Sequence, residues 1–345
     1  TWEGRLELVH QHFGNFHGVL GLQASSGEFS ATGEEAFIPV TDSTEFGLFL
    51  VEDYHAGDWT FEGGLRMDWD ERDPDTMTAD KEDFSSLSLS ASALWDVNSE
   101  WSMGLALSRA ERAPAIEELY SNVEGSGPED WVVHAATGAI ELGNADLDTE
   151  VSTTADFSVS WLSGGHRATV TVFYNDFADY INLANTGLEA DEVPVLAYEQ
   201  QDAEFYGVEV DTRFSLGTLG GGEVGLEVFF DSISGELDDG SNIPRMPPMR
   251  IGGRLDWTTD QLQLWTRVVD ADDQDDPGVN EEETEGYTRW DAGVDFNLPL
   301  GDNSLDLFFA VKNIGDEEIR LSTSFLRDLA PEAGRSIEGG IRYNF

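Results

Sequence analysis

Stretches in which apolar and polar residues alternate strictly recur along nearly the whole chain. In one of them Trp59, Phe61, Leu65, Met67 and Trp69 alternate with polar or small residues. Successive side chains of a β-strand point to opposite faces, so such a strand has one apolar face and one polar face. A membrane barrel needs strands of this kind, because lipid surrounds it and a polar lumen runs inside it. The pattern predicts an all-β fold, a transmembrane antiparallel up-and-down β-barrel.

About fifteen such strands can be recognised in the sequence, and many reach the ~9–11 residues that a tilted strand needs to cross a bilayer. Their approximate ranges are 2–11, 16–26, 43–54, 58–70, 83–95, 99–108, 151–162, 166–177, 196–214, 223–232, 249–257, 261–270, 286–297, 304–313 and 335–345. No second domain, linker or low-complexity tract interrupts them. We therefore interpret residues 1–345 as one portion of a barrel.

The connectors between these strands alternate between short and long. The long ones are 27–42, 71–82, 109–150, 177–195, 233–248, 271–285 and 314–334. In an antiparallel barrel every second connector lies on the same rim, so all the long loops are predicted on one rim and all the short turns on the other. Outer-membrane barrels have this asymmetry, with short periplasmic turns and long external loops. A soluble sandwich has no reason to sort its loops in this way.

The same alternation places the start of the first strand on the long-loop rim and Phe345 on the short-turn rim. Single-chain bacterial barrels usually have an even number of strands and both ends on the periplasmic rim. We therefore expect that further strands and other upstream sequence precede Thr1. The chain has no cysteine, which excludes a disulfide framework and a thiolate metal site.

The formal net charge is −51, from 69 acidic and 18 basic residues. A nucleic-acid partner is not expected, because phosphate contacts need a positive surface. The acidic residues are spread along the whole chain, which favours a saline habitat over a mouth that collects cations. The sequence has no phosphate-binding loop, nucleophile elbow or His-Glu-x-x-His pair, so we do not expect an enzyme.

A series of motifs, in chain order, resembles the β-barrel of TonB-dependent outer-membrane receptors. They lie at 108–114, 117–120, 136–138, 142–147, 173–175, 180–181, 205–209, 311–314 and 334–335. The resemblance covers essentially all 345 residues. It implies a 22-stranded barrel around an N-terminal plug that contacts TonB, in the outer membrane of a Gram-negative-type bacterium. This chain shows neither the plug nor about seven of the family's strands. The final strand, which ends in Phe345, resembles the signal that outer-membrane assembly machinery reads.

Further runs resemble the zinc-uptake branch of this family. They lie at 5–10, 33–36, 134–137, 201–206 and 323–326. The resemblance implies a receptor that takes up a scarce ligand, with zinc or another divalent metal favoured. A siderophore, cobalamin or glycan receptor of the same family, a passive porin-like channel and a soluble β-sandwich adhesin remain as alternatives. No resident cofactor is expected.

Candidate metal ligands lie in two of the long connectors. His134 is the one histidine of six in a long connector, Glu141 follows it seven residues later, and Glu34 and Glu35 lie in the first long connector. Imidazole and carboxylate donors suit Zn²⁺. We hypothesise that His134 and Glu35, with Glu34 and Glu141 as further candidates, help bind a metal beneath the external loops, together with ligands from the plug. The alternative is that His134 is an ordinary loop residue.

Two other polar clusters are interpreted without a ligand. His10, His12 and His17 surround the first short turn, and a metal there would face the periplasm and lie off an uptake route, so we interpret them as a polar turn. The acidic run 270–276 lacks the spacing of a calcium-binding EF-hand loop and is interpreted as a solvated acidic loop.

Charged and aromatic residues near the strand ends complete the predictions. Arg109, Glu111 and Arg112 at the start of the longest connector are expected to pair with one another or with the plug. Tryptophans near strand ends are expected to form girdles at the two membrane surfaces. These tryptophans are Trp59, Trp69, Trp95, Trp101, Trp161, Trp257 and Trp290.

Overall fold

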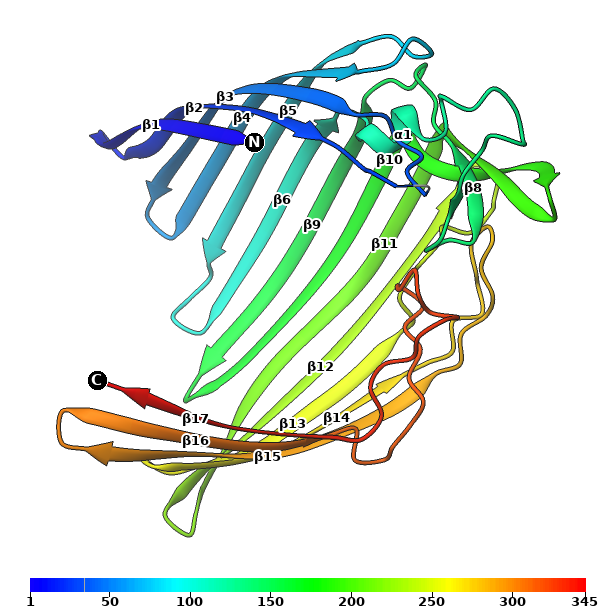
Figure 1. Ribbon diagram of the computed structural model, residues 1–345. Coiled ribbons are helices and arrows are strands. Elements are labelled where there is room, and N and C mark those ends of the chain that lie inside the picture. The colour runs from blue at the N-terminus through cyan, green and yellow to red at the C-terminus, as the bar shows by residue number, and fades with distance from the viewer. Residues whose placement is uncertain (34) are drawn as a thin grey trace.

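The computed structural model describes residues 1–33 and 35–345, and within these ranges the side chains of all residues but 12 and 13. One sheet and one short helix, α1 (Ile116–Tyr120), make up its regular structure (Figure 1). The strands are β1 (Trp2–Phe13), β2 (Phe16–Phe29), β3 (Thr41–Ala56), β4 (Trp59–Pro74), β5 (Glu82–Asp96), β6 (Trp101–Arg112), β7 (Val133–His134), β8 (Ala139–Leu142), β9 (Glu150–Ser163), β10 (His166–Ala190), β11 (Val193–Leu219), β12 (Gly222–Leu237), β13 (Arg250–Thr258), β14 (Leu262–Ala271), β15 (Tyr287–Leu300), β16 (Asn303–Lys312) and β17 (Ser336–Asn344).

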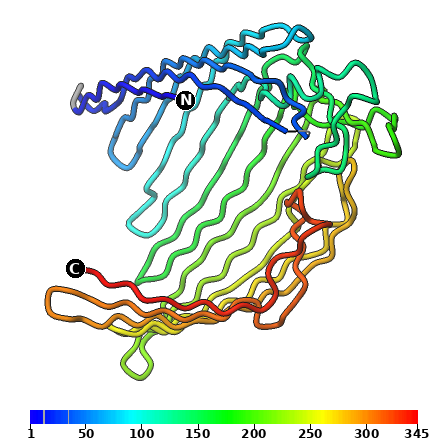
Figure 2. Tube along the Cα trace, in the orientation of Figure 1, coloured from blue at the N-terminus to red at the C-terminus, as the bar shows by residue number. Residues whose placement is uncertain are grey.

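The long strands pair antiparallel, each with its neighbour in sequence, and β6 pairs with β9 across the longest connector. Within the described residues β1 pairs only with β2, and β17 pairs only with β16. The sheet is therefore a curved wall whose two edge strands lie apart (Figures 1 and 2). The long loops gather at one rim of this wall and the short turns at the other, as the alternation of connector lengths predicted.

All fifteen strands predicted from the sequence are present, with boundaries that differ by a few residues or extend further. The short strands β7 and β8 inside the longest connector were not predicted. The predicted loop 177–195 is wrong, because β10 and β11 continue through it and meet at a two-residue turn, Asp191–Glu192. Both turn residues have positive φ, 52° and 68°, as a tight hairpin turn of this length requires.

The apolar side chains of the wall point outward. On β4, Trp59, Leu65 and Met67 are 40%, 41% and 40% exposed, and the neighbouring strands show the same pattern. The opposite face carries ion pairs such as Arg66 with Asp68, 2.6 Å apart. An apolar surface of this extent, exposed on most of the long strands, suits lipid contact, and the small buried clusters lie at the long-loop end of the wall.

Tryptophans lie side by side on neighbouring strands near the short turns. Trp59 of β4 and Trp95 of β5 stack with ring centroids 5.3 Å apart, and Trp101 of β6 lies 6.3 Å from Trp161 of β9. Each pair is directly opposite in the strand register, which brings the rings together. This arrangement is typical of an interfacial girdle.

Among the described residues, no helix has the length and apolar character that crossing a bilayer requires.

Candidate ligand-binding site in the long loops

The longest connector, between β6 and β9, is anchored where the C-terminal end of the short helix α1 is buried. Leu119 and Tyr120 of α1 have no exposed surface and pack with Leu147 and Ile181. The Tyr120 hydroxyl donates to two backbone carbonyls, 3.2 Å and 3.3 Å away. Burial, with the nearby charge of Glu82, raises the pKa of Tyr120 to about 12. The connector is therefore fixed against the wall at α1.

A second anchor is an arginine held between two carboxylates. The Arg112 guanidinium donates to Glu118 at 2.8 Å and to Glu150 at 2.9 Å, and Glu150 also accepts the backbone N–H of Ile181 at 2.9 Å. Arg109 instead pairs with Glu111 at 2.5 Å. The prediction that these residues pair within the chain is thus confirmed for Arg109 and Glu111, whereas Arg112 reaches two carboxylates further along the chain.

The candidate ligands His134 and Glu141 are in direct contact. The β7–β8 hairpin places the His134 Nδ1 atom 2.9 Å from Glu141 Oε1, and the Thr137 hydroxyl donates to the same oxygen at 2.7 Å. Glu141 is only 3% exposed, so its carboxylate depends on these partners for solvation. The Tyr198 hydroxyl of β11 donates to the other oxygen at 3.4 Å. Burial, reinforced by the Glu141 charge, raises the pKa of Tyr198.

The first long connector reaches this cluster with an aromatic ring and not with a carboxylate. The ring centroids of Phe37 and His134 are 5.0 Å apart. Glu35 is exposed, and its side chain makes no hydrogen bond or ion pair with the residues that the structure describes. Glu34 lies outside the described residues. The structure thus brings together two of the four predicted ligands, His134 and Glu141, and shows no hydrogen bond from either to Glu35 within the described residues.

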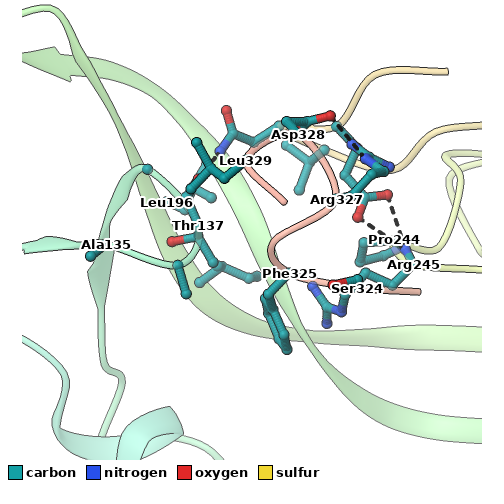
Figure 3. Close-up of a pocket in the computed structure, with 16 residues that line it drawn as sticks. Ala135, Thr137, Leu196, Pro244, Arg245, Ser324, Phe325, Arg327, Asp328 and Leu329 are labelled. Atoms are coloured by element: carbon teal, nitrogen blue, oxygen red, sulfur yellow. Dashed lines mark hydrogen bonds and ion pairs between the residues drawn. The ribbon is translucent and has the colours of Figure 1, made fainter. Parts of the chain in front are cut away.

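A cavity of about 300 Å³ lies between the long loops, next to His134 in the chain (Figure 3). Its wall combines apolar side chains with two arginines and several polar groups, contributed by six separate segments. The lining residues are Ala135, Ala136, Thr137, Gly138, Leu183, Leu196, Pro244, Arg245, Val279, Asn280, Glu281, Ser324, Phe325, Arg327, Asp328 and Leu329. An apolar cavity with a few convergent polar groups is the usual form of a ligand site.

Contacts between loops hold this cavity together. Asn280 donates to the backbone carbonyl of Thr137 at 2.9 Å, and Glu281 accepts the backbone N–H of Arg245 at 3.0 Å. The Arg245 guanidinium lies over the Phe325 ring, 4.2 Å from its centroid. Because each contact joins two different loops, the cavity exists only in the assembled rim.

Sequence reasoning did not find the cavity residues. Arg245 and Arg327 lie in two different loops with no motif that marks a ligand site, and Phe325 falls in the run 323–326, which pointed to a family branch and not to a cavity. The scarcity of basic residues is another signal that was available: the chain has 18 basic against 69 acidic residues, so two arginines on the wall of one cavity stand out.

A curved antiparallel wall with outward apolar faces and one rim of long, cavity-forming loops defines the class of outer-membrane receptor barrels. The model of the family described as "TonB dependent receptor-like, beta-barrel" matches residues 1–314. The chain belongs to this family, as its motifs indicated.

Solved structures with the same fold come from receptors and transporters of metals. The copper transporter OprC superposes with a TM-score of 0.81 at 16% identity, over 99% of this chain and 56% of that one. The FrpB iron transporter from Neisseria meningitidis gives 0.73 at 16% identity, over 98% and 54%. A ferric enterobactin receptor (PfeA) from Pseudomonas aeruginosa gives 0.67 at 17% identity, over 99% and 53%.

The chain thus spans little more than half the length of these structures. Identities of this size establish the shared fold alone. The three proteins are named for copper, iron and ferric enterobactin, so the narrower resemblance to the zinc-uptake branch gains no specific support from them.

Proposed function

We propose that this chain is part of the barrel of an outer-membrane TonB-dependent receptor that takes up a metal ion, with zinc or another divalent cation as the first candidate. TonB is the proposed energy-supplying partner, acting through a plug, and lipid surrounds the wall. The observation that carries the proposal is the contact of His134 with the buried Glu141 beside a loop cavity, on a chain whose family match covers residues 1–314.

The two candidate donors, the His134 imidazole and the Glu141 carboxylate, suit a metal ion of borderline softness such as Zn²⁺. A neutral imidazole and a carboxylate are common zinc ligands, and the Glu141 carboxylate is held in place by Thr137 and Tyr198. Two protein donors leave a site incomplete, so further ligands must come from the ion's own waters or from other protein segments. The net charge of −51 favours the approach of any cation.

A chelated metal is the second candidate, and the cavity itself favours it. Arg245 and Arg327 place two cationic groups on a wall that also carries Phe325 and Leu329. Guanidinium groups beside apolar surface suit an anionic, partly aromatic chelate better than a bare cation. The cavity of about 300 Å³ also exceeds the space that a single ion needs.

Binding measurements on the purified full-length protein test both candidates. Isothermal titration with Zn²⁺ compares the wild type with His134→Ala, and His166→Ala serves as the matched control because His166 lies at a short turn on the opposite rim. We expect His134→Ala to weaken zinc binding by at least tenfold, roughly the loss seen when metal-site contacts are removed, and His166→Ala to leave it unchanged.

The outcomes separate the candidates. Equal zinc affinity in all three proteins removes His134 from the metal site. If zinc does not bind and a ferric siderophore does, with Arg245→Ala weakening that binding, the chelated-metal candidate is the correct one. Cells that take up neither ligand faster than a strain without the gene contradict both.

A further inference from the structure

Three side chains that could bind a metal meet at the rim opposite the loop cavity. Among the side chains that the structure describes, His17, Asp53 and His55 form the one group of three metal-ligating residues whose donor atoms all lie within 4.8 Å of one another. His17 belongs to β2, whereas Asp53 and His55 belong to β3 near its turn into β4. The sequence had suggested only a polar turn here.

The strand register places the three side chains on the inner face of the wall. His17 is directly opposite Asp53, so both point to the same side. Phe16 precedes His17 on β2 and therefore points to the opposite side, as does Phe61 of β4, which is paired with Tyr54 between Asp53 and His55. Phe16 and Phe61 are 45% and 41% exposed on the outer, apolar face. The group therefore faces the polar side. His10, by contrast, has its Nε2 atom 2.8 Å from Glu52, and both belong to the outer face.

The distances fit a small transition-metal ion. His17 Nδ1 and His55 Nε2 each lie 3.2 Å from the same oxygen, Asp53 Oδ2. Bonds of about 2.0–2.2 Å in a tetrahedral site separate neighbouring ligand atoms by about 3.3–3.5 Å. A metal ion needs only a small outward movement of these three groups. Their side chains are 37%, 32% and 54% exposed, which leaves room for a water as the fourth ligand.

A second contact prepares His55 for this role. Its other ring nitrogen, Nδ1, lies 3.0 Å from the Thr60 hydroxyl on β4. A hydroxyl can donate or accept, so Thr60 stabilises His55 both when Nε2 carries the proton and when Nε2 binds a metal. Metal-binding histidines usually have such a partner for their second nitrogen, which fixes the orientation of the ring.

We propose that His17, Asp53 and His55 form a binding site for a divalent transition-metal ion, of the Zn²⁺ type, on the inner face of the wall at the short-turn rim. The ion would bridge β2 and β3 and complete its coordination with water. The site does not depend on which ligand the long loops bind, because it uses none of their residues.

The test counts metal ions in the purified full-length protein. His134→Ala serves as the parent, because its loop site should bind zinc at least tenfold more weakly, and His55→Gln and Asp53→Asn are compared within it. Titration with Zn²⁺ against a chromogenic chelator gives the number and affinity of sites, and Co²⁺ absorption reports tetrahedral coordination. His166→Ala is the matched control, because His166 also lies at a short turn but stacks on Trp161.

We expect the parent and the His166→Ala control to bind one Zn²⁺ that His55→Gln and Asp53→Asn lose or bind at least about 100-fold more weakly. Zinc should also raise the unfolding temperature of the parent and not of these two variants. Unfolding without metal checks that all four proteins fold alike. The same number of sites with the same affinity in the parent and in both variants overturns the proposal.

Discussion

Glu141 is the residue on which the loop cluster depends most. Its carboxylate is almost fully buried and accepts hydrogen bonds from Thr137 and Tyr198 while it contacts His134. A buried acceptor of this kind supports its neighbours, because removing it leaves several polar groups without partners.

We predict that Glu141→Ala destabilises the β7–β8 hairpin by about 1–3 kcal/mol, the cost of leaving buried donors unsatisfied. Limited proteolysis of the full-length protein should cleave the variant faster in residues 133–142 than the wild type. Glu141→Gln, which keeps an acceptor oxygen, should be cleaved at an intermediate rate. Identical cleavage of Glu141→Ala and the wild type contradicts the prediction.

Tyr120 gives the loops a sensitivity to alkaline pH. Its folded-state pKa is raised to about 12 from the ordinary value of 10, so the folded state holds the phenol proton more tightly than the unfolded state does. The stabilisation is complete below pH 10 and is lost as the pH rises from 10 towards 12. Two pKa units correspond to a contribution of roughly 3 kcal/mol.

We predict that Tyr120→Phe is less stable than the wild type near pH 8 and that this difference in stability shrinks or changes sign between pH 10 and 12. Near pH 8 the variant should be less stable by about 1 kcal/mol, because two hydrogen bonds to carbonyls are lost. Between pH 10 and 12 its stability should fall less steeply than that of the wild type, because phenylalanine cannot ionise. Thermal unfolding in detergent at a series of pH values measures both effects, and parallel curves would count against the assignment.

At the scale of the elements, the hydrogen bonding between β5 and β6 changes near the long loops from backbone–backbone to side chain–backbone. We call this stretch the β5–β6 seam. Backbone pairing between these strands ends at Leu89 and Arg109. Beyond that point Glu111 accepts the Leu87 N–H at 2.6 Å and Arg109 donates to the Leu87 carbonyl at 3.3 Å. The side chains of Glu111 and Arg109 therefore take the place of the missing backbone hydrogen bonds. The backbone groups of a strand edge in a membrane wall need such partners.

Glu111→Ala should open this seam. The Leu87 N–H loses its acceptor, so we predict faster hydrogen–deuterium exchange at residues 86–88, with little change at the β5 residues that remain paired with β6. Glu111→Gln is the matched control, because its amide oxygen still accepts a hydrogen bond. Equal exchange in the alanine variant and the wild type would show that the side chain does not close the seam.

At the scale of the whole molecule, the net charge of −51 acts against the folded state through self-repulsion. Salt screens this repulsion, with a Debye length of about 30 Å at 0.01 M and about 3 Å at 1 M. Repulsion spread over the whole chain therefore predicts that the folded protein is more stable at high salt.

We predict that the unfolding temperature in a nonionic detergent rises steadily between 0.01 M and 1 M NaCl, by roughly 2–4 °C for each 1 kcal/mol of repulsion removed. Choline chloride should act like NaCl, because screening does not depend on the identity of the cation. A rise with NaCl alone would indicate specific Na⁺ binding, and no rise with either salt would contradict the argument from charge.

The strands could be predicted because their signal is local. Alternation with a period of two marks each membrane-crossing segment, and connector length marks the rim. The extended hairpin of β10 and β11 was missed because its outer half carries Asn182, Asn185 and Gly187, which are typical of loops. Its strand structure comes from pairing, since β8 adds to β11 in parallel and Ile140 packs against Val195.

The sequence by itself predicted the strands of the wall and the two kinds of rim, because these depend on residues close together in the chain. It named His134 and Glu141 as candidate ligands but did not predict their direct contact. Only the tertiary structure decided which distant residues meet. Register between β2 and β3 sets His17 opposite Asp53, the pairing of β1 with β2 places His10 on the other face, and loop packing brings Phe37 to His134. The physical reason is that a one-residue change in register reverses the face of every side chain, and no local pattern specifies the register of strands joined by long loops.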